Sequence, residues 1–405
     1  MRILLINNFF RPVGGVERVF FAERALLQQH GHDVIDFSTL HTENFASPYE
    51  KYFVSGVDFQ KSGNIFKKIG RLIHSREVAK KLSALIAETR PDVAHIHGMF
   101  DLLGPTVAHT LRAARVPMVF TAHAYKLVCP NGRLFSRDAI DESCRRNLFN
   151  DVLHASVQNS FVKSFAGAFA LWLNQRRGTF HLFDRIVSPS MFLIQKHVEF
   201  GFDAAHFLQV PNPIEVTKFE LHDGEGRYVL CVARLVPEKG IRVLLDAAHR
   251  LPHIPIKIIG DGPERDALQQ YAVQLNLKNV IFEGAQSAAE VSTYLRDAAA
   301  VVVPSVCYET DPYSVLEAQA CGRVVVAAYT GGISEQIRDG ETGFLVERGN
   351  AEALATTLER VWQMSPSERA AIGRRARGFV DTVRNPELYY EGLMDLFGGL
   401  KNGSN

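Results

Sequence analysis

Two glutamates lie eight positions apart in the stretch ETDPYSVLEAQACGRVVVAAYTGGISE, residues 309–335. Glu309 follows the apolar run AAAVVVPS, which is typical of a strand buried on both faces. Pro312 keeps the residue before it out of helical geometry, so we expect Glu309 in a loop at the carboxyl end of that strand. Because open α/β sheets bind their ligands at this edge, Glu309 is a candidate ligand-binding carboxylate.

Glu317 has a simpler interpretation. Ser314 and Glu317 have the Ser-x-x-Glu spacing of a capping box, in which the hydroxyl and the carboxylate each satisfy an exposed backbone N–H at the start of a helix. We therefore predict a helix that begins near Ser314, with Glu317 as a capping carboxylate that can still present an oxygen to a ligand.

Cations and glycines suited to phosphate occur in both halves of the chain. Arg234 ends the strand-like run RYVLCVARL and Lys239 follows in VPEKG, so both can lie at the carboxyl edge of a sheet. In RPVGGVER, Gly14 and Gly15 stand at a predicted helix start, where backbone N–H groups favour an anion. The alternatives are a solvated turn for the cations and a structural turn for the glycines, whose spacing matches neither common phosphate-binding motif.

The elements that must position these residues form two series of alternating strands and helices, the pattern of a doubly wound parallel sheet. The second series repeats the first after a break. The predicted strands are RILLINNFF, HDVIDFS, DVAHIHG, PMVFTAHAY and DRIVSPS in the first half, and RYVLCVARL, IPIKIIGDG, NVIFEGA, AAAVVVPS and RVVVAAY in the second.

A linker-like segment, VPNPIEVTKFELHDGEGR, separates the two series. We therefore predict an α/β protein of two Rossmann-like domains, residues 1–212 and 213–385, facing each other across a cleft. The amphipathic segment 386–405 is expected to pack back on the first domain.

Composition limits the function classes. The chain has 405 residues, 46% hydrophobic and 22% charged, with a net charge of +1, so no overall field points to nucleic acid. Its five cysteines include no Cys-x-x-Cys pair, which favours reduced cytosolic thiols over a disulfide framework or a zinc site. The opening MRILLINNFF is interpreted as a strand, and FAGAFALWL is about half the length of a membrane span, so a soluble or peripheral protein is expected.

Taken together, these segments resemble glycosyltransferase family 4, whose members are retaining enzymes of the GT-B fold. The resemblance runs over nearly the whole chain, and its second-half motifs are specific in combination. The segments that carry it are GGVER, PDVAHIHG, VFTAHAY, PSMF and VPN, then VARLVPEKG, IIGDGPE, the Glu309-to-Glu317 spacing and TGGISE.

The resemblance implies roles for residues of the second half. Arg234 and Lys239 would neutralise the diphosphate of a nucleotide-sugar donor, and Glu317 would accept hydrogen bonds from the ribose. Glu309 would contact the transferred sugar. Backbone N–H groups around two further residues, Tyr313 and Ser314, would assist it.

The first half would complete the site. His123 matches the family histidine that reaches the donor sugar, and Gly15 would lie near the diphosphate. Family enzymes are thought to retain configuration by attack from the leaving group's own face, with no protein nucleophile. The resemblance thus implies a UDP- or GDP-sugar donor, no cofactor and no metal ligand site, and a glycan or lipid-linked acceptor in polysaccharide or glycolipid synthesis.

This sequence departs from the family pattern at two places. Ala124 follows His123 where many relatives have Asp, and residues 310–312 read Thr-Asp-Pro where many have Gly and aromatic residues. Cys129 and Cys144 flank a segment similar to a cysteine-bearing insertion in one branch of the family, and two thiols alone do not predict a metal site.

Two further groups of residues have competing interpretations. His95 and His97 alternate in a predicted strand and face the same side, as metal ligands could, but histidines satisfied within the fold are favoured. A helix predicted from Lys61 to Thr89 carries seven Lys or Arg against one Glu between residues 61 and 81. It is either a core helix with a solvated basic face or a surface that docks on anionic lipid through Lys67, Lys68 and Arg71.

Rival functions are separated by motif. A dehydrogenase would need a dinucleotide fingerprint after a strand, and the sequence has none. A sugar-nucleotide epimerase of similar architecture and an inert sugar-nucleotide-binding protein remain the alternatives to a metal-independent hexosyltransferase at the cytoplasmic face of the inner membrane.

Overall fold

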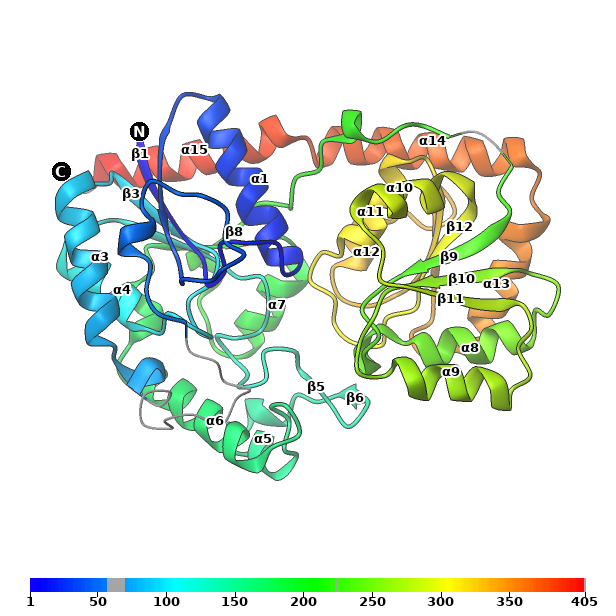
Figure 1. Ribbon diagram of the computed structural model, residues 1–405, viewed down its shortest axis with the longest axis horizontal. Helices are drawn as coiled ribbons and strands as arrows, with labels where there is room; N and C mark the ends of the chain where they lie inside the picture. The colour runs from blue at the N-terminus through cyan, green and yellow to red at the C-terminus, as the bar shows by residue number, and fades with distance from the viewer. Residues whose placement is uncertain (57–69, 223–224, 404–405) are drawn as a thin grey trace. The chain divides into compact units, whose positions relative to one another are not determined.

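The computed structural model describes residues 1–56, 70–222 and 225–403. The chain divides into two compact units, each of which is described by itself (Figure 1). The first unit comprises Met1–Leu134, Asp141–Pro213 and Glu387–Asn405, and the second comprises Phe135–Ile140 and Ile214–Pro386.

The first unit is built on a six-stranded parallel sheet of order β2-β1-β3-β4-β7-β8. The inner strands are buried along almost their whole length, which explains why their sequences are continuously apolar. The strands are β1 (Arg2–Ile6), β2 (Asp33–Phe37), β3 (Val93–Ile96), β4 (Met118–Thr121), β7 (Arg185–Ser188) and β8 (Phe207–Gln209). The principal helices are α1 (Gly15–Gln29), α3 (Arg76–Thr89), α4 (Thr106–Ala113), α6 (Phe161–Arg176), α7 (Met191–Glu199) and α15 (Pro386–Gly403).

The second unit repeats this plan with a parallel sheet of order β11-β10-β9-β12-β13-β14. Its strands are β9 (Tyr228–Val232), β10 (Ile256–Ile259), β11 (Val280–Gly284), β12 (Ala298–Val303), β13 (Val324–Ala328) and β14 (Phe344–Val346). Its helices are α8 (Ile241–His249), α9 (Arg265–Gln274), α10 (Ala288–Asp297), α11 (Tyr313–Ala320), α12 (Ile333–Gln336), α13 (Ala351–Gln363) and α14 (Pro366–Val383).

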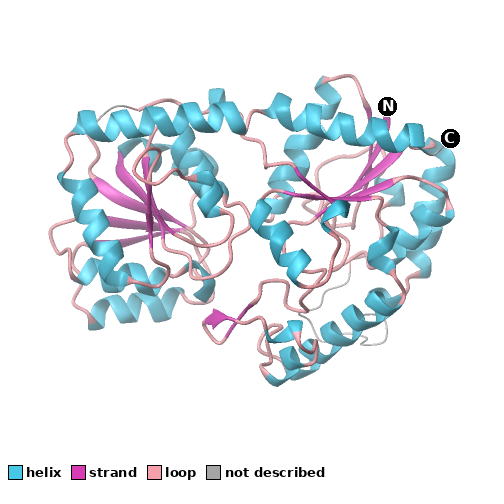
Figure 2. Cartoon of the chain, turned by 180° about the vertical axis from the view of Figure 1, so that it is seen from behind, coloured by secondary structure: helices cyan, strands magenta, loops and turns pink. Residues whose placement is uncertain are grey.

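Helices cover both faces of each sheet, as Figure 2 shows. In the second unit, Val229 and Cys231 of β9 belong to the core that α8, α9 and α13 close, whereas Leu230 belongs to the core beneath α10, α11 and α12. This alternation follows from the two-residue period of a strand. The α/β fold class and all ten predicted strands are confirmed.

The unpredicted strands are short. β8 and β14 have three residues each, and the antiparallel hairpin of β5 (Phe135–Ser136) and β6 (Ala139–Ile140) has two per strand. Segments of this length contain too few residues to show an alternating or continuous apolar pattern.

The single helix predicted from Lys61 to Thr89 is wrong. Residues 70–73 are helical, but Ser75 is extended, with φ −122° and ψ 112°, and its hydroxyl caps the start of α3. Lys67 and Lys68 lie outside the described residues. Arg71 is only 3% exposed and donates hydrogen bonds to the Ser55 carbonyl and the Glu77 carboxylate, so it cannot belong to a basic surface.

The predicted capping box at Ser314 is also wrong. Helix α11 begins at Tyr313, and Pro312 occupies the capping position without a side-chain hydrogen bond. Ser314 therefore lies inside the first turn, and Glu317 lies one turn further along the helix. Within the described residues, no helix is long and apolar enough to cross a membrane.

Candidate active site

The loop after β12 brings two predicted site residues together. Glu309 is 8% exposed, and its Oε1 accepts hydrogen bonds from Lys239 Nζ and from the Ser305 hydroxyl, each at 2.6 Å. Lys239 ends a short 3-10 helix, η6 (Pro237–Lys239), which follows β9. Because β9 and β12 are neighbours in the sheet, their carboxyl ends place the ammonium beside the carboxylate.

The contact with Glu309 keeps the Lys239 ammonium charged. Burial alone would lower the pKa of the Lys239 ammonium, but the nearby Glu309 carboxylate outweighs it and raises that pKa above its ordinary value. Lys239 is therefore fully protonated at neutral pH, and the site retains a fixed positive charge.

Two glycines hold the Glu309 loop by close backbone approach. Gly240 has φ 65°, and a Cβ there would lie 2.0 Å from the Pro304 carbonyl oxygen. Gly331 has φ 58°, and a Cβ there would lie 2.1 Å from the Glu309 carbonyl oxygen. The same oxygen accepts a hydrogen bond from the Gly332 N–H at 2.7 Å. No side chain fits at either glycine, so the loop is clamped between the VPEKG and TGGISE segments.

Arg234 is placed differently from Lys239. Its side chain is 66% exposed, and Nη2 lies 3.7 Å from Oε1 of the buried Glu238. An ion pair of this length and exposure contributes little stability. The guanidinium is therefore well placed to bind an incoming anion with a small loss of existing interactions.

The start of α11 is anchored by a buried ion pair that the sequence did not reveal. Asp311 Oδ2 accepts from Arg384 Nη1 at 2.9 Å, and Asp311 Oδ1 accepts from Gln336 Nε2 at 2.7 Å. Tyr313 and Ser314 follow in the first turn of α11, whose backbone N–H groups point away from the helix. Such a turn can bind an anion.

Glu317 is half-buried on the next turn of α11. Burial and then the Glu317 carboxylate raise the pKa of the Cys321 thiol to about 11. The thiol is therefore protonated and inert, and the role of Glu317 beside a ribose stays a prediction.

His123 follows β4 in the first unit and lies next to a second histidine. Its Nε2 is 3.1 Å from Nδ1 of His97. Burial, and then His97 and His95, hold the pKa of His123 well below its ordinary value. At neutral pH His123 is therefore an uncharged imidazole.

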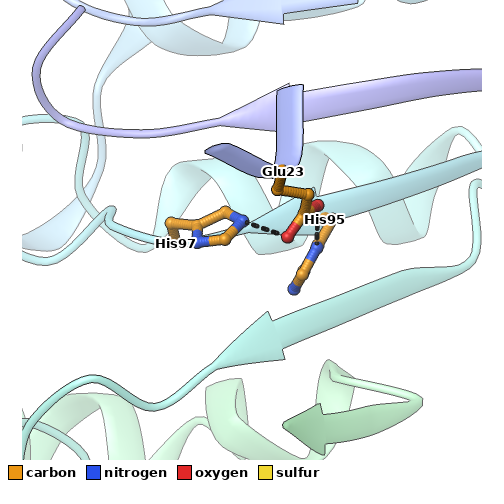
Figure 3. Close-up of side chains that lie close together, drawn as sticks. All are labelled: Glu23, His95 and His97. Atoms are coloured by element: carbon orange, nitrogen blue, oxygen red, sulfur yellow. Dashed lines mark hydrogen bonds and ion pairs between the residues drawn. The ribbon is translucent and has the colours of Figure 1, made fainter. Parts of the chain in front are cut away.

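A buried carboxylate organises these histidines. Glu23 of α1 is fully buried; its Oε1 lies 2.6 Å from His95 Nδ1, and its Oε2 lies 3.1 Å from His97 Nε2 (Figure 3). The Tyr389 hydroxyl of α15 donates to Oε2 at 2.5 Å, and the opposite ring nitrogen of His95 lies 2.6 Å from the Thr121 hydroxyl. Burial alone would raise the pKa of Glu23, but the two imidazoles hold it well below its usual range.

These contacts agree with the interpretation of His95 and His97 as histidines satisfied within the fold. Glu23 itself was missed in the sequence. It lies between Val19 and Leu26, both buried, at the spacing of the apolar face of α1, so a carboxylate on a core-facing stripe was the available signal.

Gly15 is the first residue of α1, and a Cβ there would meet no atom within 4 Å. Its neighbour Glu17 is buried in the same turn and accepts a hydrogen bond from Asn7 Nδ2 at 3.1 Å. The structure therefore leaves open space at Gly15, and its proposed role beside a diphosphate stays a prediction.

Comparison with known families identifies the chain. The family model described as Glycosyltransferase Family 4 matches residues 13–218, just over half of the sequence. The chain belongs to glycosyltransferase family 4. A second family model, described as Glycosyl transferases group 1, matches residues 214–379, which contain the Lys239–Glu309 pair.

Curated relatives are glycosyltransferases of several kinds. The chain is 30% identical over 193 residues to a GDP-mannose-dependent α-(1-6)-phosphatidylinositol monomannoside mannosyltransferase of Mycolicibacterium smegmatis, covering 45% of this chain and 50% of that protein. It is 30% identical over 210 residues to the putative colanic acid biosynthesis glycosyltransferase WcaL of Escherichia coli, covering 49% and 50%. The matches thus span about half the length of these relatives.

One relative is covered more fully. A D-inositol 3-phosphate glycosyltransferase of Frankia alni is 28% identical over 338 residues, which are 75% of this chain and 77% of that protein.

Solved structures show the same architecture over nearly the whole chain. HepE of Anabaena in complex with UDP matches with a TM-score of 0.68 at 19% identity, covering 98% of this chain and 100% of that one. Sucrose-phosphate synthase of Thermosynechococcus elongatus matches with a TM-score of 0.70 at 19% identity, covering 99% of each chain. These likenesses confirm the predicted GT-B fold.

Proposed function

We propose that this family 4 protein is a retaining glycosyltransferase that moves a sugar from a nucleoside-diphosphate donor to a glycan or lipid-linked acceptor in polysaccharide or glycolipid synthesis. The observation that carries the proposal is the 2.6 Å contact between Lys239 and Glu309 at the carboxyl ends of β9 and β12. This contact supports the proposal, because a fixed cation suited to a phosphate lies beside a carboxylate suited to a sugar.

Cations at the leaving group supply the main catalytic effect. Departure of a nucleoside diphosphate places negative charge on its terminal phosphate, and a preorganised cation stabilises that charge as it develops. Lys239 is fixed by Glu309, whereas the exposed Arg234 closes on the diphosphate when it binds. The first-turn N–H groups at Tyr313 and Ser314 add donors on the same edge.

Glu309 acts on the sugar. Its Oε1 accepts hydrogen bonds from Lys239 and Ser305. Among the described residues, none donates a hydrogen bond to Oε2. A carboxylate oriented in this way can accept hydroxyl protons of the sugar and stabilise the positive charge that builds at the anomeric carbon. Glu317 accepts hydrogen bonds from the ribose.

His123 contributes a neutral nitrogen with a defined role. If His97 donates Nε2–H to Glu23, its Nδ1 must accept the proton of His123 Nε2. The remaining His123 nitrogen, Nδ1, is then a hydrogen-bond acceptor for a sugar hydroxyl. Glu23 is a positioning residue because it acts on His123 through His97.

Retention without a metal is the simplest chemistry for this residue set. The acceptor attacks from the face that the diphosphate leaves, and the departing phosphate oxygen takes the acceptor's proton. The sequence contains no Asp-x-Asp pair to hold a divalent ion against the diphosphate, and Arg234 and Lys239 supply the positive charge instead. The UDP-bound neighbour and the GDP-mannose-dependent relative support UDP- and GDP-sugars as the first donors to test.

We also propose a peripheral position at the cytoplasmic face of the membrane. Helix α6 exposes apolar side chains at positions 161, 165, 169 and 172, which share one helical face. Arg76 and Lys80 of α3 are exposed cations within the basic segment 61–81, although Arg71 is buried. Exposed apolar side chains and exposed cations in the same unit are suited to an anionic lipid surface.

The decisive experiment is a screen of UDP-, GDP- and ADP-sugars with the purified protein, read by thermal shift and by release of nucleoside diphosphate and of glycosylated product. We expect one donor to raise the melting temperature and to be consumed, with the anomeric configuration of the product unchanged. An epimerised sugar nucleotide without transfer would identify the alternative epimerase, for which the comparisons offer no support. Binding without turnover of any donor would identify an inert binding protein.

A further inference from the structure

A second cluster of buried polar side chains lies in the first unit, apart from the histidines. Cys129, Cys144 and Asp151 are 0%, 3% and 0% exposed, and their ligand atoms all lie within 4.8 Å of one another. We propose that these three residues bind a zinc ion that stabilises the loop carrying His123.

Local structure aims the three side chains at one point. Cys129 lies in the loop after β4, Cys144 in the 3-10 helix η2 (Ser143–Arg145), and Asp151 in α5 (Asn150–Leu153). The backbone N–H of Cys129 donates to the Tyr125 carbonyl at 2.8 Å, and the backbone N–H of Asn131 donates to Asp151 Oδ2 at 3.2 Å. The chain thus leaves β4, forms the β5–β6 hairpin and returns to the same buried position.

The cluster has three acidic groups and no cation to balance them. No Lys, Arg or His of the described residues forms an ion pair with Asp151, and its Oδ1 makes no hydrogen bond there. A buried carboxylate without a balancing cation is costly, and a divalent cation would remove that cost by binding all three groups in their ionised forms.

The histidine cluster provides a contrast within the same unit. There, Glu23 already contacts His95 and His97 and accepts a hydrogen bond from Tyr389. Both of its oxygens are already engaged by protein groups, and a metal ion would have to displace them. Around Asp151 the described residues offer no such compensation.

Ligand type and distance favour zinc. Two thiolates exclude magnesium and calcium, which prefer oxygen ligands, and are suited to a borderline-soft ion. In a tetrahedral site with Zn–S of about 2.3 Å and Zn–O of about 2.1 Å, sulfur and oxygen ligands lie about 3.6 Å apart. The distance from Cys129 Sγ to Asp151 Oδ2 is 3.6 Å without an ion. The buried hydroxyl of Ser156, close to Asp151, or a water completes the fourth position.

An ion at this site would restrict the loop that follows His123. The loop that begins at His123 continues directly into Tyr125, Cys129 and the hairpin, and the Tyr125 N–H also donates to the Gly132 carbonyl at 3.0 Å. An ion at the far end of this loop would reduce the conformational freedom of the chain that follows His123. The zinc site does not depend on the proposed sugar-transfer chemistry.

The test is metal analysis of the full chain purified without chelators. We expect about one zinc per chain, because a buried three-ligand site releases its ion slowly. Cys129→Ser and Asp151→Asn should each lower the bound zinc at least tenfold. Cys231→Ala, which removes a buried thiol from β9 in the second unit, is the matched control and should retain it.

A second measurement keeps the test valid if the variants fail to fold. Folded wild-type protein is separated from any unfolded material, stripped of metal and loaded with Co²⁺. It is then examined for a thiolate-to-cobalt charge-transfer absorption in the near ultraviolet. This absorption is expected in the wild type and in Cys231→Ala. Zinc below about a tenth of an equivalent, together with no charge-transfer band after cobalt loading, would overturn the proposal.

Discussion

The carboxyl ends of the two sheets hold their charged side chains in contrasting ways. In the second unit, Lys239 and Glu309 form a partly exposed ion pair whose two charges remain available to a ligand. In the first unit, Glu23 is fully buried and contacts His97, which in turn contacts His123. Charge therefore remains partly exposed at the edge of the second sheet, whereas in the first unit imidazole rings cover the carboxylate.

This contrast predicts different costs for similar substitutions. A group that faces developing charge should affect turnover strongly, whereas a group that acts through another side chain should affect turnover weakly and stability more. Replacing glutamate by glutamine at several positions tests this difference, because each change removes a charge and keeps the shape of the side chain.

The largest effect is expected for Glu309→Gln. Loss of one aimed electrostatic contact costs on the order of 3 kcal/mol, or about a hundredfold in kcat, with a smaller change in nucleoside-diphosphate affinity. Steady-state turnover at saturating donor and acceptor measures it, with Glu352→Gln on the exposed face of α13 as the control. Near-normal turnover in a folded Glu309→Gln variant would show that this loop is structural only.

Glu317→Gln should weaken nucleoside-diphosphate binding more than it lowers kcat. The amide keeps one acceptor for the ribose but loses the charge, so we expect roughly tenfold weaker nucleoside-diphosphate binding and a kcat within a few-fold of wild type. Isothermal titration with UDP and GDP, alongside turnover at saturating donor, separates the two quantities. If Glu317→Gln lowered kcat as much as Glu309→Gln, the two carboxylates would not have separate roles.

Glu23→Gln should lower kcat by on the order of tenfold and reduce the free energy of unfolding at neutral pH by about 2 kcal/mol. The pKa of Glu23 is depressed in the folded state, so its stabilising contribution is present above the ordinary value of 4.5 and is lost as the pH falls. The pKa of His97 is depressed below 6.5 as well, so acid protonates it preferentially in the unfolded chain and adds to the loss.

Urea unfolding between pH 7 and pH 3 measures this prediction, because the Glu23 contribution is lost mainly below pH 4.5. The difference in stability between wild type and Glu23→Gln should shrink on acidification. Tyr389→Phe, which removes one hydrogen bond to Glu23 and no charge, should give an intermediate loss with little pH dependence. A difference that stayed constant over this range would mean that Glu23 is not ionised in the native protein.

Residues that depend on local sequence could be predicted, whereas residues that depend on contacts between distant segments could not. The VPEKG and TGGISE segments and the Glu309-to-Glu317 spacing lie in short stretches beside strands, so local pattern was enough to place them. The contacts of Glu23 with His95 and Tyr389 form only when chain segments far apart in the sequence meet. The Arg384 partner of Asp311 was hidden for the same reason, since the two are separated by 73 positions.

Errors at helix ends have a separate cause. Ser314 and Glu317 fit the capping-box spacing, but the capping position is occupied by Pro312, two residues before Ser314. The helix therefore begins at Tyr313. Ser75 interrupted a predicted long helix because its hydroxyl caps α3. In both cases a residue that is equally compatible with a helix interior and a helix end was assigned from spacing alone.

The proposed membrane contact of the first unit should respond to changes on α6. Replacing both Phe161 and Phe165 by Ser should reduce binding to anionic liposomes about tenfold, since each exposed ring would lose buried apolar area. Lys80→Glu should have a smaller, salt-dependent effect of about 1 kcal/mol. Val273→Ser, which changes an exposed apolar residue of the second unit, is the control for flotation. Equal recovery of all variants would rule out this surface.

The smallest effect is expected from removing divalent cations during turnover. Because Arg234 and Lys239 carry the positive charge for the diphosphate, we expect turnover with EDTA and no added magnesium or manganese to remain within about twofold of the untreated rate. The zinc content of the same sample must be measured, since loss of an ion at Cys129 would loosen the loop after His123 for a structural reason. A rate that fell at unchanged zinc and returned only with magnesium or manganese would show that the two cations of the second unit do not suffice.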